Sequence, residues 1–300
     1  MADQADNLRQ LIHEATPGPP VSAPGPPMIA VTGGRAGVGI TTVAMNLATV
    51  MADGGERVLL VDADRERSSL AEMAGVKPTT IDYTVSDVLA GKCTAADALM
   101  PGPAGTRLLA NRDGRKSPME FSRHAQQRLV AELQSLHSGF DLLVVDLGSG
   151  LNSWARRFWL HARLVLLITT TDSSALMDSY VLVKRSVADG IGPDLRLVVN
   201  QCEDDGIAAD AHCRISNACA RFLSRSLPAV PSLPSYVGGA GAAPLPRVWE
   251  SPDTSFGHAM LWLGRAVGDV LNGLECQRDA CATACGRFDD VQPSHGTARC

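Results

Sequence analysis

The sequence predicts a doubly wound α/β domain built on a mostly parallel β-sheet, and three observations support this fold class. Short apolar runs alternate with segments of helical periodicity between residues 28 and 271, as expected for successive β-α-β units. The run at 57–64 is apolar until it ends in acids, which is typical of a strand buried on both faces. A glycine-rich turn at 33–39 joins the first strand to the first helix. With 300 residues and 45% hydrophobic content, the chain can bury such a core as a single domain.

The individual elements follow from the spacing of apolar residues and from the turn residues between them. The first helix, for example, places Val43 and Leu47 on one face and stops at Gly54 and Gly55, which are typical helix-ending residues. We expect strands at 28–32, 57–64, 106–111, 141–150, 163–170 and 195–200, and a short strand-to-loop segment at 228–234. We expect helices at 42–53, 122–137, 173–188, 208–226 and 255–271, and two short helices within 84–99.

The overall composition argues against several classes of protein. A net charge of −5 and a pI near 5.8 disfavour binding to nucleic acid through bulk charge, so we predict no nucleic-acid partner. No apolar stretch approaches the roughly 18 residues of a membrane span, and the polar, acidic N-terminus does not resemble a signal peptide. The eight cysteines are scattered, which favours reduced thiols and a cytoplasmic location.

The N-terminal segment predicts a short amphipathic helix that docks on a partner. In residues 1–15, apolar Leu8, Leu11 and Ile12 fall on one face at helical spacing. The proline-rich linker at 16–27 must be extended, so this helix would be held away from the domain. A helix this short has too little surface to fold alone and would order on a partner. A vestigial tail is the alternative.

The two remaining parts of the chain are a nucleotide-type α/β domain at 28–271 and a C-terminal tail at 272–300. The tail has no periodicity, and we expect it to be disordered. Its cysteines lack the spacing of a metal site, so we expect no metal there. These cysteines are Cys276, Cys281, Cys285 and Cys300.

The turn between the first strand and the first helix predicts a phosphate site. The spacing of Gly34, Gly39 and Thr41 fits the pattern G-x-x-x-x-G-K-[ST] at every fixed position but one. Glycines let backbone N–H groups crowd around an anion, and the helix N-terminus adds the positive end of its dipole. The exception is Ile40, which stands where the phosphate-binding lysine belongs.

Polar residues also follow the other predicted strands. In parallel sheets, ligands bind at the carboxyl ends of strands, where Asp62, Asp64, Asp146 and Asn200 all fall. Asp146 ends an apolar strand, as an acid does when it reaches Mg²⁺ through water, and the N–H of Gly148 could reach a terminal phosphate. We therefore expect these side chains to share one site with the glycine loop.

These motifs together resemble the MinD/ParA group of deviant Walker-A ATPases, a P-loop NTPase family whose loop reads K-G-G-x-G-K-[ST]. The resemblance covers about residues 28–271 and places Arg35 at the family's signature lysine. It implies that Asp64 orients the attacking water, and that Thr41, Asp62 and Asp146 hold Mg²⁺, partly through water. It implies the following nucleotide-contacting residues: Gly34, Arg35, Ala36, Gly37, Val38, Gly39, Ile40, Thr41, Thr42, Gly148 and Asn200, the last of which reads the adenine.

One subfamily fits best. The segment DQADNLR at 3–9 is similar to the D-Q-A-x-x-L-R segment of FlhG, a MinD-like regulator of flagellar number. The resemblance implies a partner of the FlhF type, an SRP-like GTPase, contacted through Gln4, Leu8 and Arg9. It also implies a nucleotide-dependent homodimer, and it leaves open a peripheral position at the inner membrane or the cell pole. Because helix 256–271 carries few basic residues, we expect it to pack on the core and not on lipid.

The isoleucine at position 40 changes what the resemblance implies about activity. Without a charged donor there, we expect weak binding of ATP or ADP with Mg²⁺, and hydrolysis that is slow or absent. Arg35 could compensate in part, because a guanidinium binds phosphate well. Two alternatives stay open: an active ParA-like ATPase switch that positions DNA or another cargo, and a scaffold that works without nucleotide.

Overall fold

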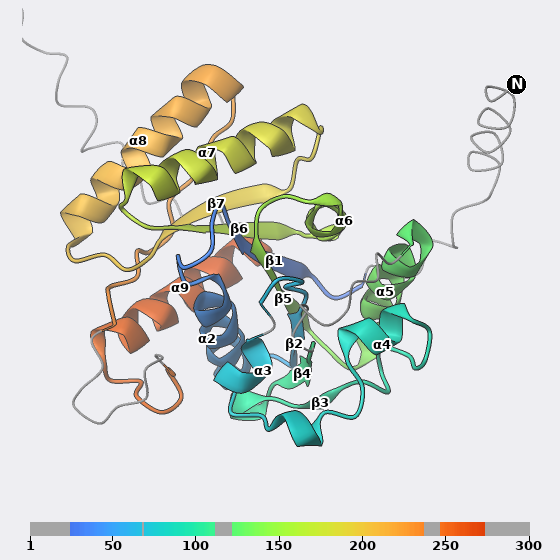
Figure 1. Ribbon diagram of the computed structural model, residues 1–300. Helices are drawn as coiled ribbons and strands as arrows, with labels where there is room; N and C mark the ends of the chain where they lie inside the picture. Colours follow the sequence, from blue (N-terminus) through green and yellow to red (C-terminus); the bar gives the residue numbers. More distant parts are fainter. Residues whose placement is uncertain (1–24, 68, 112–121, 237–246, 274–300) are drawn as a thin grey trace, which may run out of the picture.

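A seven-stranded, mostly parallel sheet organises the part of the chain that the computed structural model describes, which is residues 25–67, 69–111, 122–236 and 247–273 (Figure 1). The strand order is β3-β4-β2-β5-β1-β6-β7, and only the β3–β4 pair is antiparallel. The strands are β1 (Met28–Gly33), β2 (Val58–Asp62), β3 (Met100–Pro101), β4 (Arg107–Leu109), β5 (Leu142–Ser149), β6 (Leu164–Thr169) and β7 (Asp194–Val199).

Helices cover both faces of this sheet, as the alternation along β1 shows. Ile29 and Val31 point into one apolar cluster, which holds the inner faces of α2 and α9, whereas Met28 and Ala30 point into the other, which holds α4 to α8 (Figure 1). The helices are α2 (Ile40–Asp53), α3 (Leu70–Met73), α4 (Val85–Leu89), α5 (Arg123–Ser135), α6 (Ser153–His161), α7 (Ser173–Ala188), α8 (Asp205–Leu223) and α9 (Ser255–Leu271). Short 3₁₀ turns lie at Pro78–Thr80, Pro103–Gly105 and Leu136–Ser138. The predicted doubly wound fold is therefore confirmed.

The last helix packs as the sequence predicts. Phe256, Met260, Leu263 and Val267 of α9 are buried in the same cluster as the inner face of α2, while Trp262 on the opposite side is exposed. None of the helices in the described ranges is both long enough and apolar enough to span a bilayer. Association with a membrane surface stays a prediction.

The segment at 84–99 differs from the sequence prediction. Its first half forms α4, which a reciprocal capping box at Thr84 and Asp87 initiates, but its second half is a turn. The Asp97 carboxylate accepts hydrogen bonds from the hydroxyl and backbone N–H of Thr94, at 2.7 and 3.0 Å. The N–H of Ala95 donates to Glu132 of α5 at 2.7 Å. The Asp97 N–H donates back to the Thr94 hydroxyl at 3.2 Å, so these two residues also form a capping box. The turn that it starts ends before β3 begins at Met100, so the prediction of a second helix is wrong.

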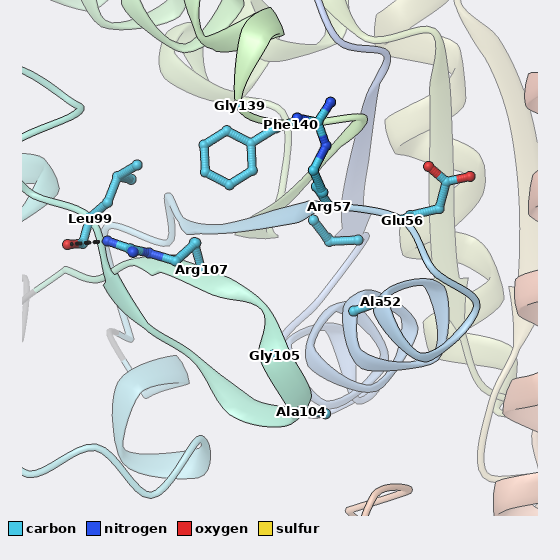
Figure 2. Close-up of a pocket in the computed structure, with 10 residues that line it drawn as sticks. Ala52, Glu56, Arg57, Leu99, Ala104, Gly105, Arg107, Gly139 and Phe140 are labelled. Atoms are coloured by element: carbon cyan, nitrogen blue, oxygen red, sulfur yellow. Dashed lines mark hydrogen bonds between the residues drawn. The ribbon is translucent and has the colours of Figure 1, made fainter.

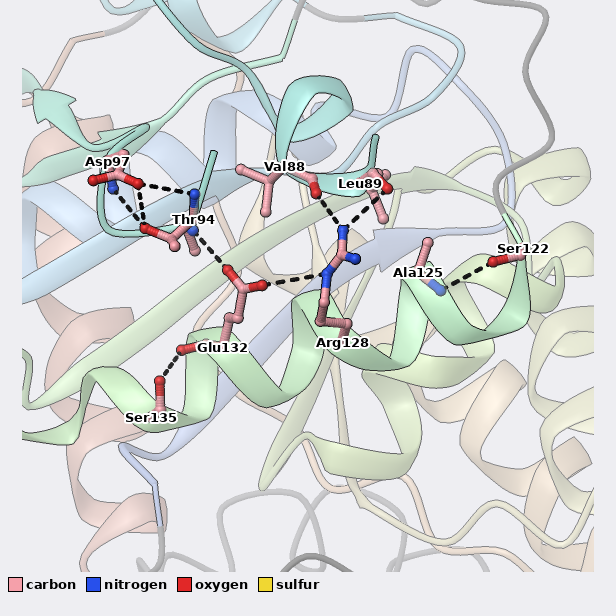
Figure 3. A network of polar contacts seen from close by, with 10 residues as sticks. Val88, Leu89, Thr94, Asp97, Ser122, Ala125, Arg128, Glu132 and Ser135 are labelled. Carbon is pink, nitrogen blue, oxygen red and sulfur yellow. Dashed lines mark hydrogen bonds and ion pairs between the residues drawn. The ribbon is translucent and has the colours of Figure 1, made fainter. Parts of the chain in front are cut away.

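A polar network then fixes α4 against α5 (Figure 3). Arg128 donates to the carbonyl oxygens of Val88 and Leu89, at 2.7 and 3.2 Å, and so satisfies the C-terminal end of α4. Its Nε lies 3.4 Å from the Glu132 carboxylate on the next turn of α5. Side chains of α5 thus supply the hydrogen bonds that hold α4 and the following turn in place.

Several predictions concern residues outside the described ranges. They are the docking helix at 1–15 with Gln4, Leu8 and Arg9, the linker up to residue 24, and the tail from residue 274 with its four cysteines.

Candidate functional site

The glycine loop after β1 has the backbone of a phosphate cradle. Gly37 and Gly39 adopt positive φ angles of 89° and 94°, which side-chain-bearing residues rarely tolerate. Gly39 is also the N-cap of α2 and provides no side-chain hydrogen bond, so the N–H groups of the first turn lack a side-chain cap. Ala36, which replaces a family glycine, does not have a positive φ, so its Cβ introduces no backbone strain.

Ile40 points away from this cradle. Its side chain is 6% exposed and belongs to the apolar cluster beneath the loop, together with Val38 and Val43. The Cδ1 atom lies so close to Gly33 that a Cβ added there would approach it to 2.9 Å. Ile40 therefore contributes to the core under the loop and brings neither charge nor a hydrogen-bond donor to the phosphate side.

Asp62 and Asp146 lie side by side, because β2 and β5 are neighbours and these two residues are paired in their register. Both are fully buried. Burial raises the pKa of Asp146 to about 7; the Thr41 hydroxyl and the Gly148 N–H oppose this shift, and the charge of Asp64 adds to it. Although Thr41 is close enough to influence the pKa, no hydrogen bond of normal geometry reaches Asp146 Oδ2.

The carboxyl end of β5 lies against Asp64. A Cβ at Gly148 would lie 2.4 Å from the Asp64 carboxyl carbon, so only glycine fits there. The Gly148 N–H donates to Asp146 Oδ1 at 3.0 Å, and its carbonyl accepts from the Thr32 hydroxyl at 2.9 Å. Asp64 Oδ1 itself accepts from the N–H of Glu66 at 2.7 Å. The strand ends are thereby joined into one polar cluster.

Asn200, which follows β7, contacts the glycine loop, and Arg35 is part of that loop. Asn200 Nδ2 donates to the carbonyl oxygen of Val38 at 2.8 Å. Arg35 extends to α7, where Nη1 donates to the Ser174 hydroxyl at 2.5 Å and Nε lies 3.7 Å from the Asp178 carboxylate. The structure thus gathers the predicted site residues along the carboxyl ends of β1, β2, β5 and β7.

Two hydrogen bonds near the site were not predicted from the sequence. The Trp154 indole N–H donates to the carbonyl oxygen of Ala63, between the two acids after β2, at 2.8 Å. Gln201 Nε2 donates to the carbonyl oxygen of Gly37 at 3.2 Å. Neither residue belongs to a motif with a fixed spacing, so no local signal pointed to them.

The residues present fit a magnesium-bound nucleotide. Asp146 Oδ2 is a buried carboxylate oxygen without a hydrogen-bond partner, which is the kind of ligand that Mg²⁺ takes. In the described ranges, no group of three or more His, Cys, Asp or Glu side chains is arranged as a dedicated metal cage. Mg²⁺ at nucleotide sites is usually held by one or two protein oxygens together with phosphate and water, so this donor set suffices.

A separate hollow lies elsewhere on the domain (Figure 2). It measures about 400 Å³ and is lined by residues at the start of β2, β4 and β5, among them Arg57, Phe140 and Arg107. The Arg107 guanidinium donates to the carbonyl oxygen of Leu99 at 2.9 Å. None of the predicted site residues lines it.

Three features together define a P-loop NTPase fold: the sheet order, the glycine loop after β1, and the acids near the carboxyl ends of β2 and β5. A protein-family model described as "AAA domain" matches residues 27–185, more than half of the chain. The antiactivator FleN of Pseudomonas aeruginosa is 31% identical over 207 residues, which span 69% of this chain and 73% of FleN. The chain belongs to the MinD/ParA family of deviant Walker-A ATPases.

One MinD sequence supports this assignment, and one MinD structure supports the fold. The septum site-determining protein MinD of Synechocystis is 31% identical over 175 residues, or 58% of this chain and 64% of that protein. Among solved structures, MinD of Pyrococcus horikoshii in complex with Mg-ADP superposes with a TM-score of 0.63 at 21% identity, covering 84% of this chain and 99% of that one. At that identity the structural likeness supports the fold alone.

Proposed function

We propose that this protein is an FlhG-like, adenine-nucleotide-binding regulator of flagellar number or placement that hydrolyses ATP slowly or not at all. The likeness of residues 3–9 to the FlhG segment supports a flagellar role. The 31% identical relative is named an antiactivator, which supports regulation. The P. horikoshii relative was solved with Mg-ADP, which supports ATP or ADP with Mg²⁺ as the ligand.

One observation carries the weak-hydrolysis part of this proposal: the cradle is intact but Ile40 is buried beneath it. Backbone N–H groups and the start of α2 can still bind phosphate. A charge-assisted hydrogen bond contributes about 1.5–3 kcal/mol, so its absence lowers affinity about tenfold or more. The loss is larger for hydrolysis, because charge on the transferred phosphoryl group is stabilised mainly in the transition state.

The other site residues take roles that follow from their positions. Thr41, Asp62 and Asp146 would hold Mg²⁺, partly through water, and the bound ion would neutralise charge on the phosphate oxygens. Asp64, which lies against Gly148, would orient a water molecule. Burial raises the pKa of Asp146 to about 7, so magnesium should bind more tightly as the pH rises through this range.

Titration with ATP and ADP in the presence of Mg²⁺, followed by a turnover assay, tests the nucleotide half of the proposal. We expect measurable binding with little or no phosphate release. Turnover at the rate of an ordinary family member would favour the active ParA-like switch. If neither nucleotide binds, the protein is a scaffold that works without one.

The partner half is tested by the GTPase rate of an FlhF-type protein. We expect the full chain to stimulate that rate, and we expect deletion of residues 1–15 or the combined change of Gln4, Leu8 and Arg9 to alanine to abolish the stimulation. Glu14→Ala serves as the control, because the predicted helix places Glu14 off the apolar face. Unchanged stimulation after the deletion would refute the docking role.

The proposed homodimer is tested by sedimentation. We expect a monomer without nucleotide and a dimer with Mg-ATP if the site holds enough nucleotide to close the interface. Arg35, the residue at the signature position, contacts Ser174 and Asp178 of its own chain here, so a trans role requires those contacts to break. A dimer that forms equally well without nucleotide would contradict this part of the proposal.

A further inference from the structure

The turn after β7 sends two amide side chains into the glycine loop. Asn200 is 4% exposed, and its Nδ2 donates to the carbonyl oxygen of Val38 at 2.8 Å. The next residue, Gln201, donates from Nε2 to the carbonyl oxygen of Gly37 at 3.2 Å. Asn200 and Gln201 therefore bind the carbonyl groups of two neighbouring loop residues that lie more than 160 positions away in the sequence.

The backbone of Gln201 is arranged for this contact. Gln201 has a φ of 58°, one of three positive φ angles among the non-glycine residues that the structure describes. Glutamine is not a residue that favours this left-handed conformation, so the surrounding structure must impose it. Asn200 is held just as closely: a Cβ at Gly39 would come within 2.2 Å of its Nδ2. The glycine at position 39 makes room for the asparagine amide.

These carbonyl groups belong to the part of the loop that would surround a phosphate. When successive N–H groups turn toward an anion, the carbonyl groups between them must find other partners. Ile40 offers no donor to them, because its side chain is a hydrocarbon. The donors come instead from Asn200 and Gln201.

We propose that Asn200 and Gln201 are positioning residues that hold the glycine loop in its phosphate-binding conformation before nucleotide arrives. This inference rests on the proposed function, because it assigns the loop to a phosphate ligand. It gives Gln201 a role that no motif assigns, and it gives Asn200 a second role besides the base contact that the family resemblance implies. Since the two residues act on the loop, their effect falls on the phosphate groups and is shared by all nucleotides with the same phosphates.

Binding of fluorescent N-methylanthraniloyl derivatives of ADP and GDP to the full chain tests the role of Gln201. Gln201→Gly removes the donor but relieves the left-handed backbone, so we expect it to keep or raise the thermal stability while weakening both ligands about three- to tenfold, in line with one lost hydrogen bond. Gln127→Ala is the matched control, because Gln127 is also an exposed glutamine but lies on α5, outside both the glycine loop and the turn after β7. Unchanged affinity, or a loss for ADP alone, would overturn the proposal.

Hydrogen exchange of the nucleotide-free protein separates this inference from the proposed function. In peptides spanning residues 33–41, Gln201→Gly and Asn200→Ala should speed amide exchange, whereas Gln127→Ala should not. If the wild-type chain bound no nucleotide at all, the proposed function would fail, yet faster exchange in these variants would still support the clamp on the loop. Exchange that stays at the wild-type rate in both variants would refute the clamp, whatever the nucleotide results.

Discussion

Replacing Ile40 with lysine should lower the stability of the free protein and raise its affinity for ATP. Ile40 lies under the glycine loop with 6% of its surface exposed. Burying an isoleucine side chain contributes about 1.5–3 kcal/mol, and a lysine there must leave the core to keep its charge in water. We expect Ile40→Lys to lose about 2 kcal/mol without nucleotide, which corresponds to a fall in melting temperature of about 4–8 °C for a domain of this size.

The same change has the opposite effect in the presence of Mg-ATP. A lysine ammonium at the phosphate side contributes a charge-assisted hydrogen bond of about 1.5–3 kcal/mol, which is roughly a tenfold to hundredfold gain in affinity. Saturating ATP should therefore raise the melting temperature of the variant more than that of the wild type. Turnover should rise as well, because the charge acts most strongly on the transition state.

Calorimetric titration and thermal unfolding, with and without Mg-ATP, measure both effects. Ile40→Met is the matched control: it has an unbranched side chain similar in shape to that of lysine but carries no charge. We expect the methionine variant to show some loss of stability and no gain in affinity. If Ile40→Lys binds ATP no better than Ile40→Met, the missing charge is not what weakens the site, and the reasoning is wrong.

Three further predictions concern the polar cluster. Gly148→Ala should lower the free energy of unfolding by about 2–4 kcal/mol in urea titrations, because its Cβ would meet the carboxyl group of Asp64. Gly150→Ala is the control: Gly150 also has a positive φ but has open space around it, so the loss should be only about 1 kcal/mol. Equal losses in the two variants would contradict this reasoning. The pKa of Asp146 rises from 3.8 in the unfolded chain to about 7 in the folded protein, so its contribution to stability is complete below pH 4 and is lost as the pH rises through 7. In magnesium-free unfolding curves, Asp146→Asn should therefore reduce the dependence of the unfolding free energy on pH. An unchanged dependence would refute the pKa shift. Trp154→Phe leaves a buried backbone carbonyl without its donor and should cost about 1–3 kcal/mol by thermal unfolding; a neutral result would show that water replaces the indole.

The fold and the place of the site could be read from the sequence because their signals are local or periodic. Apolar runs that end in Asp62 and Asp146 identify buried parallel strands, and the carboxyl ends of such strands lie at one edge. The spacing from Gly34 to Thr41 locates the phosphate loop in the same way. The structure adds that Asp62 and Asp146 are direct neighbours in the sheet.

The local pattern at 84–99 predicts more helix than the structure forms. The segment at 84–99 has the composition of two helices, and Thr94 and Asp97 exchange the hydrogen bonds of a capping box, yet the second helix does not continue because β3 begins at Met100. Pro101 in that strand disfavours a helical conformation at Met100, so the chain leaves the turn after the N–H groups of Ala98 and Leu99 have bonded three residues back.

The sequence by itself determined that a phosphate loop is present and that its lysine is missing. Only the tertiary structure decided where Ile40 points, which is into the core, and which groups support the loop in its place, namely Asn200 and Gln201. The physical reason is that these contacts join the loop after β1 to the turn after β7, and β7 is two strands away from β1 in the sheet. Side-chain direction and long-range hydrogen bonds depend on how strands are ordered in space, and no spacing along the chain encodes that order.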